Sequence, residues 1–329
     1  MRDRQPPGRQ RGALSTMWGR IWERYFIYAV AAATLGVFAI LTPNILSGAN
    51  IINLLTNAAM VAIAAAGMTY AITGGGFDLS IGSTLAITTC ILGRLIPSLG
   101  LWASFAAALA VGAALGAVNG IIITKFRIQT FVATLSTMVI YRGLALIYTQ
   151  GHDATLYEYL SIKVFTGGDI LGVPVPIALT AVVFLLAFAV YRWTPFGVRV
   201  RSIGSNIAAS RISGLPVDRT LIGIFMLTSV TTVLSGTLLT SQILVGNGRV
   251  GQGFELEVIT ATILGGTSLS GGRGNIWGTL VAALLLTIIA NGLNLLGLPD
   301  QYQRLAKGLI FIVALSLDSV GRLIRERRA

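Results

Sequence analysis

Long apolar runs separated by short polar gaps constrain this sequence more than any other feature. Ten stretches approach the length of about 20 mostly apolar residues that a helix needs to cross a bilayer. They are residues 25–43, 51–72, 80–97, 101–123, 129–149, 174–191, 220–243, 256–271, 276–297 and 303–320. Stretches 80–97 and 256–271 adjoin glycine-rich segments, so either could be broken or re-entrant. The pattern predicts an all-α, polytopic membrane protein with about 10 transmembrane helices.

The composition supports this prediction. Hydrophobic residues make up 54% of the 329 positions and charged residues only 11%, too few to cover a water-soluble domain. The apolar content also excludes intrinsic disorder. The single cysteine, Cys90, excludes a disulfide framework, and a zinc site or a Ser-His-Asp triad would depend on the single histidine, His152. We therefore expect no metal site and no catalytic site in this chain.

The basic residues predict the orientation in the membrane. The net charge of +12 would suggest nucleic-acid binding in a soluble protein, but here Lys and Arg lie mostly between the apolar runs, so we expect no nucleic-acid partner. If successive gaps alternate between sides, eighteen Lys and Arg fall on one side and four on the other. The positive-inside rule then predicts that both termini are cytoplasmic. The expected units are the tail 1–24, a transmembrane domain 25–320 and the tail 321–329. The transmembrane domain has halves of about 25–191 and 220–320, joined by the cytoplasmic loop 192–219.

Two segments of the chain resemble each other. Residues 74–79 read GGGFDL and residues 251–256 read GQGFEL, and further on Asn119-Gly is matched by Asn291-Gly at a similar offset. Each GxGF motif follows a predicted span, and five spans separate the starts of the two copies. An odd number of spans gives the copies opposite orientation. The pattern predicts a 5+5 inverted repeat, which is typical of transporters.

An acidic residue follows the first glycine-rich break. Asp78, beside Phe77, lies at the start of stretch 80–97. Acidic groups at membrane depth are costly and often functional, so we interpret Asp78 and Phe77 as candidate pathway or gate residues. The alternative is that the Asp78 carboxylate caps the next helix by accepting free backbone N–H groups, and the two roles are compatible.

Several amides fall within predicted spans. An amide exposed to lipid is unfavourable, so these side chains are expected to face the protein interior. They could hydrogen-bond a polyol in the pathway, or they could simply bond one helix to another, which the sequence favours for any single residue. The candidates are Asn53, Asn57, Asn119, Asn291 and Asn294.

Glycine spacing predicts a close helix contact. Gly112, Gly116 and Gly120 share one face of stretch 101–123, and without Cβ atoms that face lets another backbone approach. Another glycine-rich segment, residues 271–274, lacks the P-loop spacing. We therefore expect no ATP hydrolysis in this chain.

The loop 192–219 is predicted to hold a short helix. Residues 205–212 have a composition compatible with a helix, with Ser205 as its expected cap and Gly214 and Pro216 closing it. A short cytoplasmic helix between two halves of a bundle could dock a soluble partner. An inert amphipathic connector is the alternative.

Several motifs together carry a family resemblance. Residues 75–83 read GGFDLSIGS, residues 265–274 read GGTSLSGGRG, and residues 291–297 read NGLNLLG. With residues 203–214 (IGSNIAASRISG), these motifs resemble the permease subunits of bacterial sugar ABC importers of the ribose, xylose and galactose type, over roughly residues 40–320.

The resemblance implies a homodimeric permease in the bacterial inner membrane. Its implied partners are a cytoplasmic ATPase with two fused cassettes, which uses ATP-Mg, and a periplasmic sugar-binding protein. The implied ATPase-docking residues are Gly204, Ser205, Asn206, Arg211, Ser213 and Gly214, and Glu255 and Glu257 are candidate external contacts for the binding protein. Ile207 and Ala208 replace the glutamates that relatives usually carry, which changes the charge of the ATPase contact.

Two alternatives to a sugar permease stay open at this point. One is a branched-chain amino acid ABC permease, which is related but lacks these signatures. The other is a membrane-embedded enzyme that acts on lipid-linked sugar. Such an enzyme would need clustered acids or basic phosphate contacts, and neither is visible in the sequence.

Overall fold

A computed structural model describes residues 27–299, 301–303, 305–306, 308–310, 312 and 316. The expected tails 1–24 and 321–329 lie outside the described residues. In the described part, seven helices are long and apolar enough to cross a membrane. They are α2 (Gly48–Thr73), α3 (Ile81–Leu99), α4 (Leu101–Lys125), α5 (Thr130–Thr149), α7 (Val175–Trp193), α10 (Val217–Ile243) and α12 (Ile276–Leu295). A shorter apolar helix, Ile27–Leu41, precedes them.

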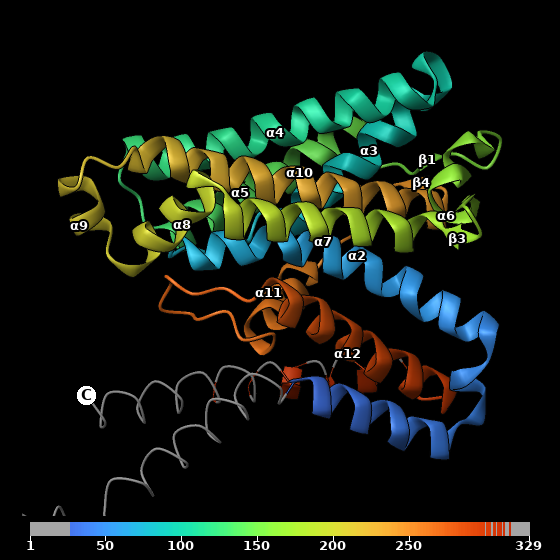
Figure 1. Ribbon diagram of the computed structural model, residues 1–329. Coiled ribbons are helices and arrows are strands. Elements are labelled where there is room, and N and C mark those ends of the chain that lie inside the picture. The colour runs from blue at the N-terminus through green and yellow to red at the C-terminus, as the bar shows by residue number, and fades with distance from the viewer. Residues whose placement is uncertain are drawn as a thin grey trace, which may run out of the picture.

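Most of the short elements lie at the two ends of the helix bundle, whereas α11 lies between them (Figure 1). Helices α8 (Pro195–Ser205) and α9 (Ile207–Ile212) lie at one end, here called the α9 end. The opposite, β end carries two small antiparallel pairs, β1 (Ala154–Thr155) with β4 (Val245–Gly246) and β2 (Asp169–Ile170) with β3 (Val173–Pro174). The remaining short elements are η1 (Pro43–Leu46), η2 (Leu160–Lys163), α6 (Val164–Gly167) and α11 (Phe254–Leu264).

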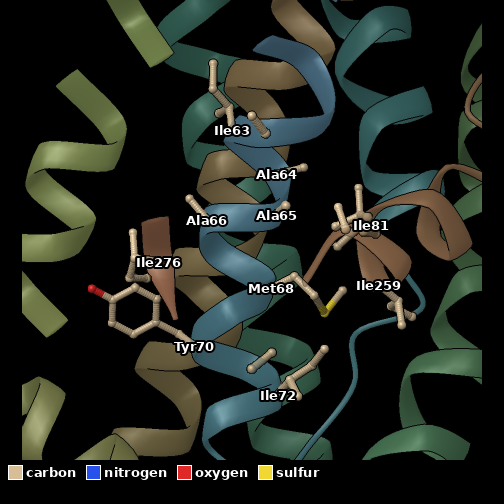
Figure 2. Packing of buried hydrophobic residues seen from close by; sticks show 14 of the residues in the cluster. Ile63, Ala64, Ala65, Ala66, Met68, Tyr70, Ile72, Ile81, Ile259 and Ile276 are labelled. Atoms are coloured by element: carbon tan, nitrogen blue, oxygen red, sulfur yellow. The ribbon is translucent and has the colours of Figure 1, made fainter. Parts of the chain in front are cut away.

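Helix α2 forms the centre of the main core. From Ala58 to Thr73 every residue except Met60 is buried, whichever way its side chain faces. A helix that is apolar on all sides is stable only when other elements surround it. Figure 2 shows Tyr70 and Ile276 packed on one side of α2, and Met68, Ile81 and Ile259 on another.

The glycine face predicted on residues 101–123 makes a close helix contact. A Cβ atom at Gly116 would lie 2.7 Å from the Met226 Cα atom of α10, and one at Gly120 would overlap Ile222. The third glycine of the face, Gly112, lies against Val233. The sequence prediction of a packing face is therefore confirmed, and α10 is the helix that it meets.

Helices α4, α5 and α7 expose large apolar side chains on the outside of the bundle. Val139 and Ile147 of α5 and Leu185 and Leu186 of α7 are each more than half exposed. Such a surface would cause aggregation in water. It suits a helix that faces lipid, as expected for a membrane bundle.

The expected eighth span, 256–271, is not a continuous helix. Helix α11 has only 11 residues, about 16 Å at 1.5 Å per residue, whereas the hydrocarbon core is about 30 Å thick. The helix ends at Leu264, and Gly266 directly beyond its cap has a φ angle of 93°, which is incompatible with a continuing helix. The third expected span, by contrast, is the continuous 19-residue helix α3, and most of the tenth lies outside the described residues.

Candidate functional site

The break between α2 and α3 places Asp78 in the protein interior. Gly75 ends α2 with a φ angle of 88°, a conformation that side chains disfavour. Asp78 is completely buried, and its Oδ1 atom accepts hydrogen bonds from the Ser80 backbone N–H at 2.9 Å and from the Ser80 hydroxyl at 2.6 Å. The carboxylate therefore satisfies the backbone N–H of Ser80, the residue before α3, and not the N–H groups of the first turn of α3 as the capping interpretation expected.

A chain of hydrogen bonds continues from Asp78 across three helices. The Ser80 hydroxyl accepts from Asn119 Nδ2 of α4 at 2.8 Å. The Tyr141 hydroxyl of α5 lies 3.1 Å from Asn119 Oδ1 and 2.9 Å from the Leu115 carbonyl oxygen. Asn119 thus bonds helices together, the simpler of its two interpretations. The sequence analysis missed Tyr141, because nothing local distinguishes it from other tyrosines in the membrane.

The second oxygen of Asp78 has a different environment. Among the described residues, Asp78 Oδ2 has no hydrogen-bond partner. Burial raises the pKa of Asp78 to about 6, against the opposing effect of the hydrogen bonds from Ser80 and Asn119. Phe77 is half-buried against the core around α2, and its carbonyl oxygen accepts from the Thr134 hydroxyl at 3.1 Å.

The chain enters the bundle again from the β end without forming a helix. After β4, the Asn247 backbone N–H donates to the Thr89 hydroxyl at 3.2 Å. Further on, Gly251 lies so close to α3 that a Cβ atom there would be 2.8 Å from the Gly82 carbonyl oxygen. Helix α11 begins only at Phe254. This part of the chain therefore consists of a non-helical entry segment, residues 247–253, followed by the short helix α11.

Arg142 of α5 holds the entry segment. Its Nη1 atom donates to the Gly248 carbonyl oxygen at 2.9 Å and also to the Val250 carbonyl oxygen. Backbone groups without a helix partner must be satisfied in this way inside a membrane protein. Glu255 attracts the Arg142 guanidinium electrostatically, and its Oε2 atom occupies the space that a Cβ atom at Gly82 would need.

A cavity of about 300 Å³ lies among α2, α10, α11 and α12. It is lined by Asn57, Met60, Val61, Leu85, Leu239, Gly251, Phe254, Glu257, Thr287, Ala290, Asn291, Asn294 and Gln303. The structure thus brings three of the predicted amides, Asn57, Asn291 and Asn294, to one cavity. The other predicted residues lie elsewhere. Asn53 is exposed on α2. Asn119 and Asp78 belong to the buried hydrogen-bond network that joins α3, α4 and α5.

Two of the three cavity amides already form hydrogen bonds within the protein. Asn291 forms a reciprocal pair with Asn50 of α2, at 2.9 and 3.1 Å. Asn57 Oδ1 accepts from Gln242 Nε2 of α10 at 3.1 Å. Asn50 was not predicted from the sequence, although it is an amide near a helix start like its neighbours. Asn291 therefore joins α2 to α12, whereas Asn57 keeps donor groups for other partners.

The two glutamates of α11 lie deeper than the sequence suggested. We expected Glu255 and Glu257 to be external contacts, but neither lies with the strands of the β end. Glu255 Oε2 is a buried atom beside α3, and Glu257 lines the cavity. The entry segment explains the difference, since α11 begins only after the chain has run along α3 as far as Gly82.

Three backbones meet at the α9 end. A Cβ atom at Gly204 of α8 would overlap the Thr73 carbonyl oxygen and lie 2.6 Å from the Gly272 nitrogen. The Gly272 N–H donates to the same Thr73 oxygen at 2.8 Å, and the Gly274 N–H donates to the Tyr191 hydroxyl at 2.8 Å. We call Thr73, Gly204 and Gly272 the glycine junction. It joins α2, α8 and the loop between α11 and α12.

The predicted short helix in loop 192–219 is α9, but its cap differs from the prediction. Asn206, with an extended backbone, accepts from the Ala209 N–H at 2.9 Å. Ser205 instead ends α8, where its hydroxyl donates to the Arg201 carbonyl oxygen. Gly214 follows the helix with a φ angle of 74°, and Arg211 forms an exposed ion pair with Asp218 at 2.7 Å. Ser213 is the last residue before Gly214 and is exposed.

Comparison with known proteins now decides the family. Residues 50–315 match the family described as the permease component of the branched-chain amino acid transport system. The chain belongs to this permease family. The match runs from α2 to α12. It therefore includes the hydrogen bonds around Asp78, the cavity and the glycine junction.

Curated members of the permease family resemble the chain over most of its length. The ribose import permease protein RbsC of Bacillus subtilis is 41% identical over 86% of this chain and 88% of its own. RbsC of Escherichia coli K12 is 37% identical over 87% and 90%. The L-arabinose transport system permease protein AraH of the same strain is 36% identical over 92% and 93%. No solved structure gives a significant match.

Membership of the permease family confirms the resemblance inferred from the sequence motifs. The chain is accordingly a membrane-embedded transport permease. The relatives named above are transport proteins rather than enzymes, which disfavours an enzyme that acts on lipid-linked sugar.

Proposed function

We propose that this chain is the transmembrane subunit of an ATP-driven importer that translocates a monosaccharide or related polyol. The observation that carries the proposal is the likeness to ribose and L-arabinose permeases along nearly the whole chain. Ribose and arabinose are both aldopentoses. A neutral, hydroxyl-rich solute also suits a cavity whose polar groups are mostly amides.

The proposed topology has ten crossings, with the α9 end in the cytoplasm and the β end outside. The ten crossings are the seven long helices, the helix Ile27–Leu41, the entry segment with α11, and the expected span 303–320. A 5+5 inverted repeat is supported by the two GxGF-acid-Leu motifs, one of which lies before α3 and the other at the start of α11. Both termini are then cytoplasmic.

The proposed partners follow from this orientation. A cytoplasmic double-cassette ATPase, which consumes ATP-Mg, docks on α8 and α9, and a periplasmic sugar-binding protein delivers sugar at the β end. Two copies of the permease form a homodimer in the bacterial inner membrane. The chain itself needs no cofactor.

The glycine junction supplies a route by which docking could act on the pathway. Movement of α8 must displace the end of α2 or the loop before α12, because no side chain separates their backbones. Both α2 and α12 line the cavity. We propose that closure of the ATPase shifts this junction and so switches access to the cavity, with Asp78 and Phe77 at the neighbouring break as gate residues.

The test of this function is uptake by the assembled importer in vesicles. We expect ATP-dependent uptake of D-ribose or L-arabinose when the cognate ATPase and binding protein are present. The competing candidate is a branched-chain amino acid importer, the transport system named in the description of the family, although the relatives named above are ribose and L-arabinose permeases. Uptake of L-leucine, with neither sugar transported, would replace the proposal by that candidate.

A further inference from the structure

We infer that the turn between α4 and α5, residues 125–129, binds the headgroup of an anionic phospholipid, with Lys125 and Arg127 as its charged contacts. The inference goes beyond the proposed function, because it concerns the lipid around the permease and not the transported solute. It requires only that the helix bundle is embedded in a membrane.

An exposed apolar stripe of α4 leads to the first of these cations. The stripe residues recur every three or four positions, so they share one face of the helix. They are Val111, Ala114, Val118 and Ile121, all exposed. Lys125 follows Ile121 by one turn on the same face, about 6 Å further along the helix axis, and it is also exposed. A lysine at this place can keep its stem beside acyl chains and its ammonium group among headgroups.

The turn itself continues the lipid-facing surface. All of residues 125–129 are exposed, and the Phe126 ring between the two cations is 72% exposed. Beyond the turn, α5 begins with Phe131 and Val132, whose side chains are each about half exposed. The apolar surfaces of two membrane helices therefore meet at this turn, so it lies where the acyl chains of a lipid end and its headgroup begins.

The exposed charges at this corner of the bundle are positive. Helix α4 runs antiparallel to α10 along the glycine face described above, so its end lies beside the first turn of α10. That turn holds Arg219, a further exposed cation, and Asp218, which already pairs with Arg211. The part of the chain that the structure describes contains no other ion pair. Lys125 and Arg127 therefore have no acidic partner among the described residues.

An anionic phospholipid suits this surface in two ways. Its phosphate group accepts charge-assisted hydrogen bonds from Lys and Arg, and its acyl chains can lie along the apolar stripe of α4. Each basic side chain at a membrane surface strengthens the binding of an anionic lipid about fivefold. A zwitterionic phospholipid carries its own ammonium group, so it gains little from the two cations.

Quenching of a fluorophore by brominated lipids tests the site. Ile121→Cys places the fluorophore one turn from Lys125, in a Cys90→Ala background that removes the single native cysteine. The labelled full-length permease is reconstituted in phosphatidylcholine nanodiscs with a minor share of either dibrominated phosphatidylglycerol or dibrominated phosphatidylcholine. We expect phosphatidylglycerol to associate near the label at least about fivefold more strongly than phosphatidylcholine.

Variants of the turn identify the contacts. Lys125→Gln combined with Arg127→Asn should remove the preference for phosphatidylglycerol. Arg127 has a φ angle of 55°, a left-handed conformation in which Asn is common, so this change adds no backbone strain. Lys125→Gln alone should weaken the preference several-fold, and it serves if the double variant fails to fold. Lys125→Arg keeps the charge and should keep the preference.

Two controls locate the effect. Arg94→Gln removes an exposed cation from α3 and should leave the preference near Ile121→Cys unchanged. A label at Ala103→Cys, exposed near the other end of α4, should report the same lipid association with and without Lys125 and Arg127. A change at both labels would mean that the two cations act on the whole membrane surface rather than at the turn, which would overturn the site.

The remaining outcomes are equally decisive. Equal association of the two lipids near Ile121→Cys would overturn the proposal. A preference that persists in the double variant would overturn the assignment of Lys125 and Arg127. If the double variant loses the cytoplasmic ATPase in co-purification while lipid quenching stays the same, the turn is a contact for that protein and not for lipid. None of these measurements depends on sugar uptake, so the failure of this site and the failure of the proposed function are distinguishable.

Discussion

The backbone of Gly204, in α8, lies directly against the carbonyl oxygen of Thr73, the last residue of α2, with no space for a Cβ atom between them. The Thr73 oxygen also accepts the hydrogen bond from Gly272. This contact links the surface proposed for ATPase docking to a helix that lines the cavity. The link is made by backbone atoms, which cannot yield by changing a side-chain rotamer.

Gly204→Ala is therefore expected to disturb the glycine junction. Added atoms in a close-packed contact typically cost about 1–3 kcal/mol, and this methyl group would meet backbone atoms. We expect a lower unfolding temperature in detergent and weaker coupling of ATP hydrolysis to sugar uptake in vesicles. Gly143→Ala in α5 is the matched control, since nothing lies within 4 Å of its Cβ position. Equal behaviour of the two variants would contradict the junction.

Asp78→Asn separates the two roles of this residue. Asn keeps an acceptor for the Ser80 backbone N–H and caps helices about as well as Asp, so folding and assembly should be nearly normal. Asn cannot ionise, so the variant removes the ionisable carboxyl from this buried position. We expect sugar uptake per assembled complex to fall strongly, and Asp169→Asn at the β end to transport normally. Wild-type uptake by Asp78→Asn would reduce the residue to a helix cap.

Arg142 should be essential for the entry segment. Replacing it by Met leaves the carbonyl groups of Gly248 and Val250 without their charged donor, and hydrogen bonds to charged groups contribute about 1.5–3 kcal/mol. We expect Arg142→Met to lower the thermal stability and to increase protease cleavage within residues 247–253, with Arg142→Lys intermediate. Arg94→Met, at an exposed position of α3, is the control. Unchanged cleavage in Arg142→Met would show that the entry segment holds its path without this side chain.

The proposed orientation can be checked with two single cysteines. Thr155 and Ser213 are both exposed, and they lie at the β end and beside α9, respectively. In a Cys90→Ala background, Thr155→Cys should react with an impermeant maleimide from the periplasmic side only. Ser213→Cys should react from the cytoplasmic side only. Labelling of both from the same side would refute the ten-crossing topology.

Arg211→Glu tests the docking surface. Charge complementarity steers such contacts, so reversing an exposed charge beside α9 should reduce co-purification with the ATPase several-fold. The change also breaks the ion pair with Asp218. Asp218→Asn breaks the same pair but keeps the Arg211 charge, and exposed pairs contribute little to stability, about 0–1 kcal/mol. If both variants lose the ATPase equally, the effect comes from the pair rather than from docking.

Local properties of the chain were enough to predict much of the bundle. The length of each apolar run determines whether a helix can cross the bilayer, and seven of the ten expected spans are long apolar helices in the structure. Glycines at four-residue spacing predicted the face of α4 that meets α10, since only backbone approach requires that spacing. The helix within loop 192–219 was also predicted, because caps and helix composition are local signals.

The positions of the polar groups were decided by the tertiary structure alone. The sequence favoured helix contacts over a pathway role for any single Asn, and for Asn119 the partners that decide it, Ser80 and Tyr141, come from other helices. Hydropathy averaged over a stretch did not show that α11 ends at Leu264, although the glycine-rich residues beyond it indicated that the stretch could be broken. Nor could it place Glu257 on a cavity wall. Inside a membrane protein a polar group bonds to whichever helix meets it, and that choice depends on packing between residues far apart in the sequence.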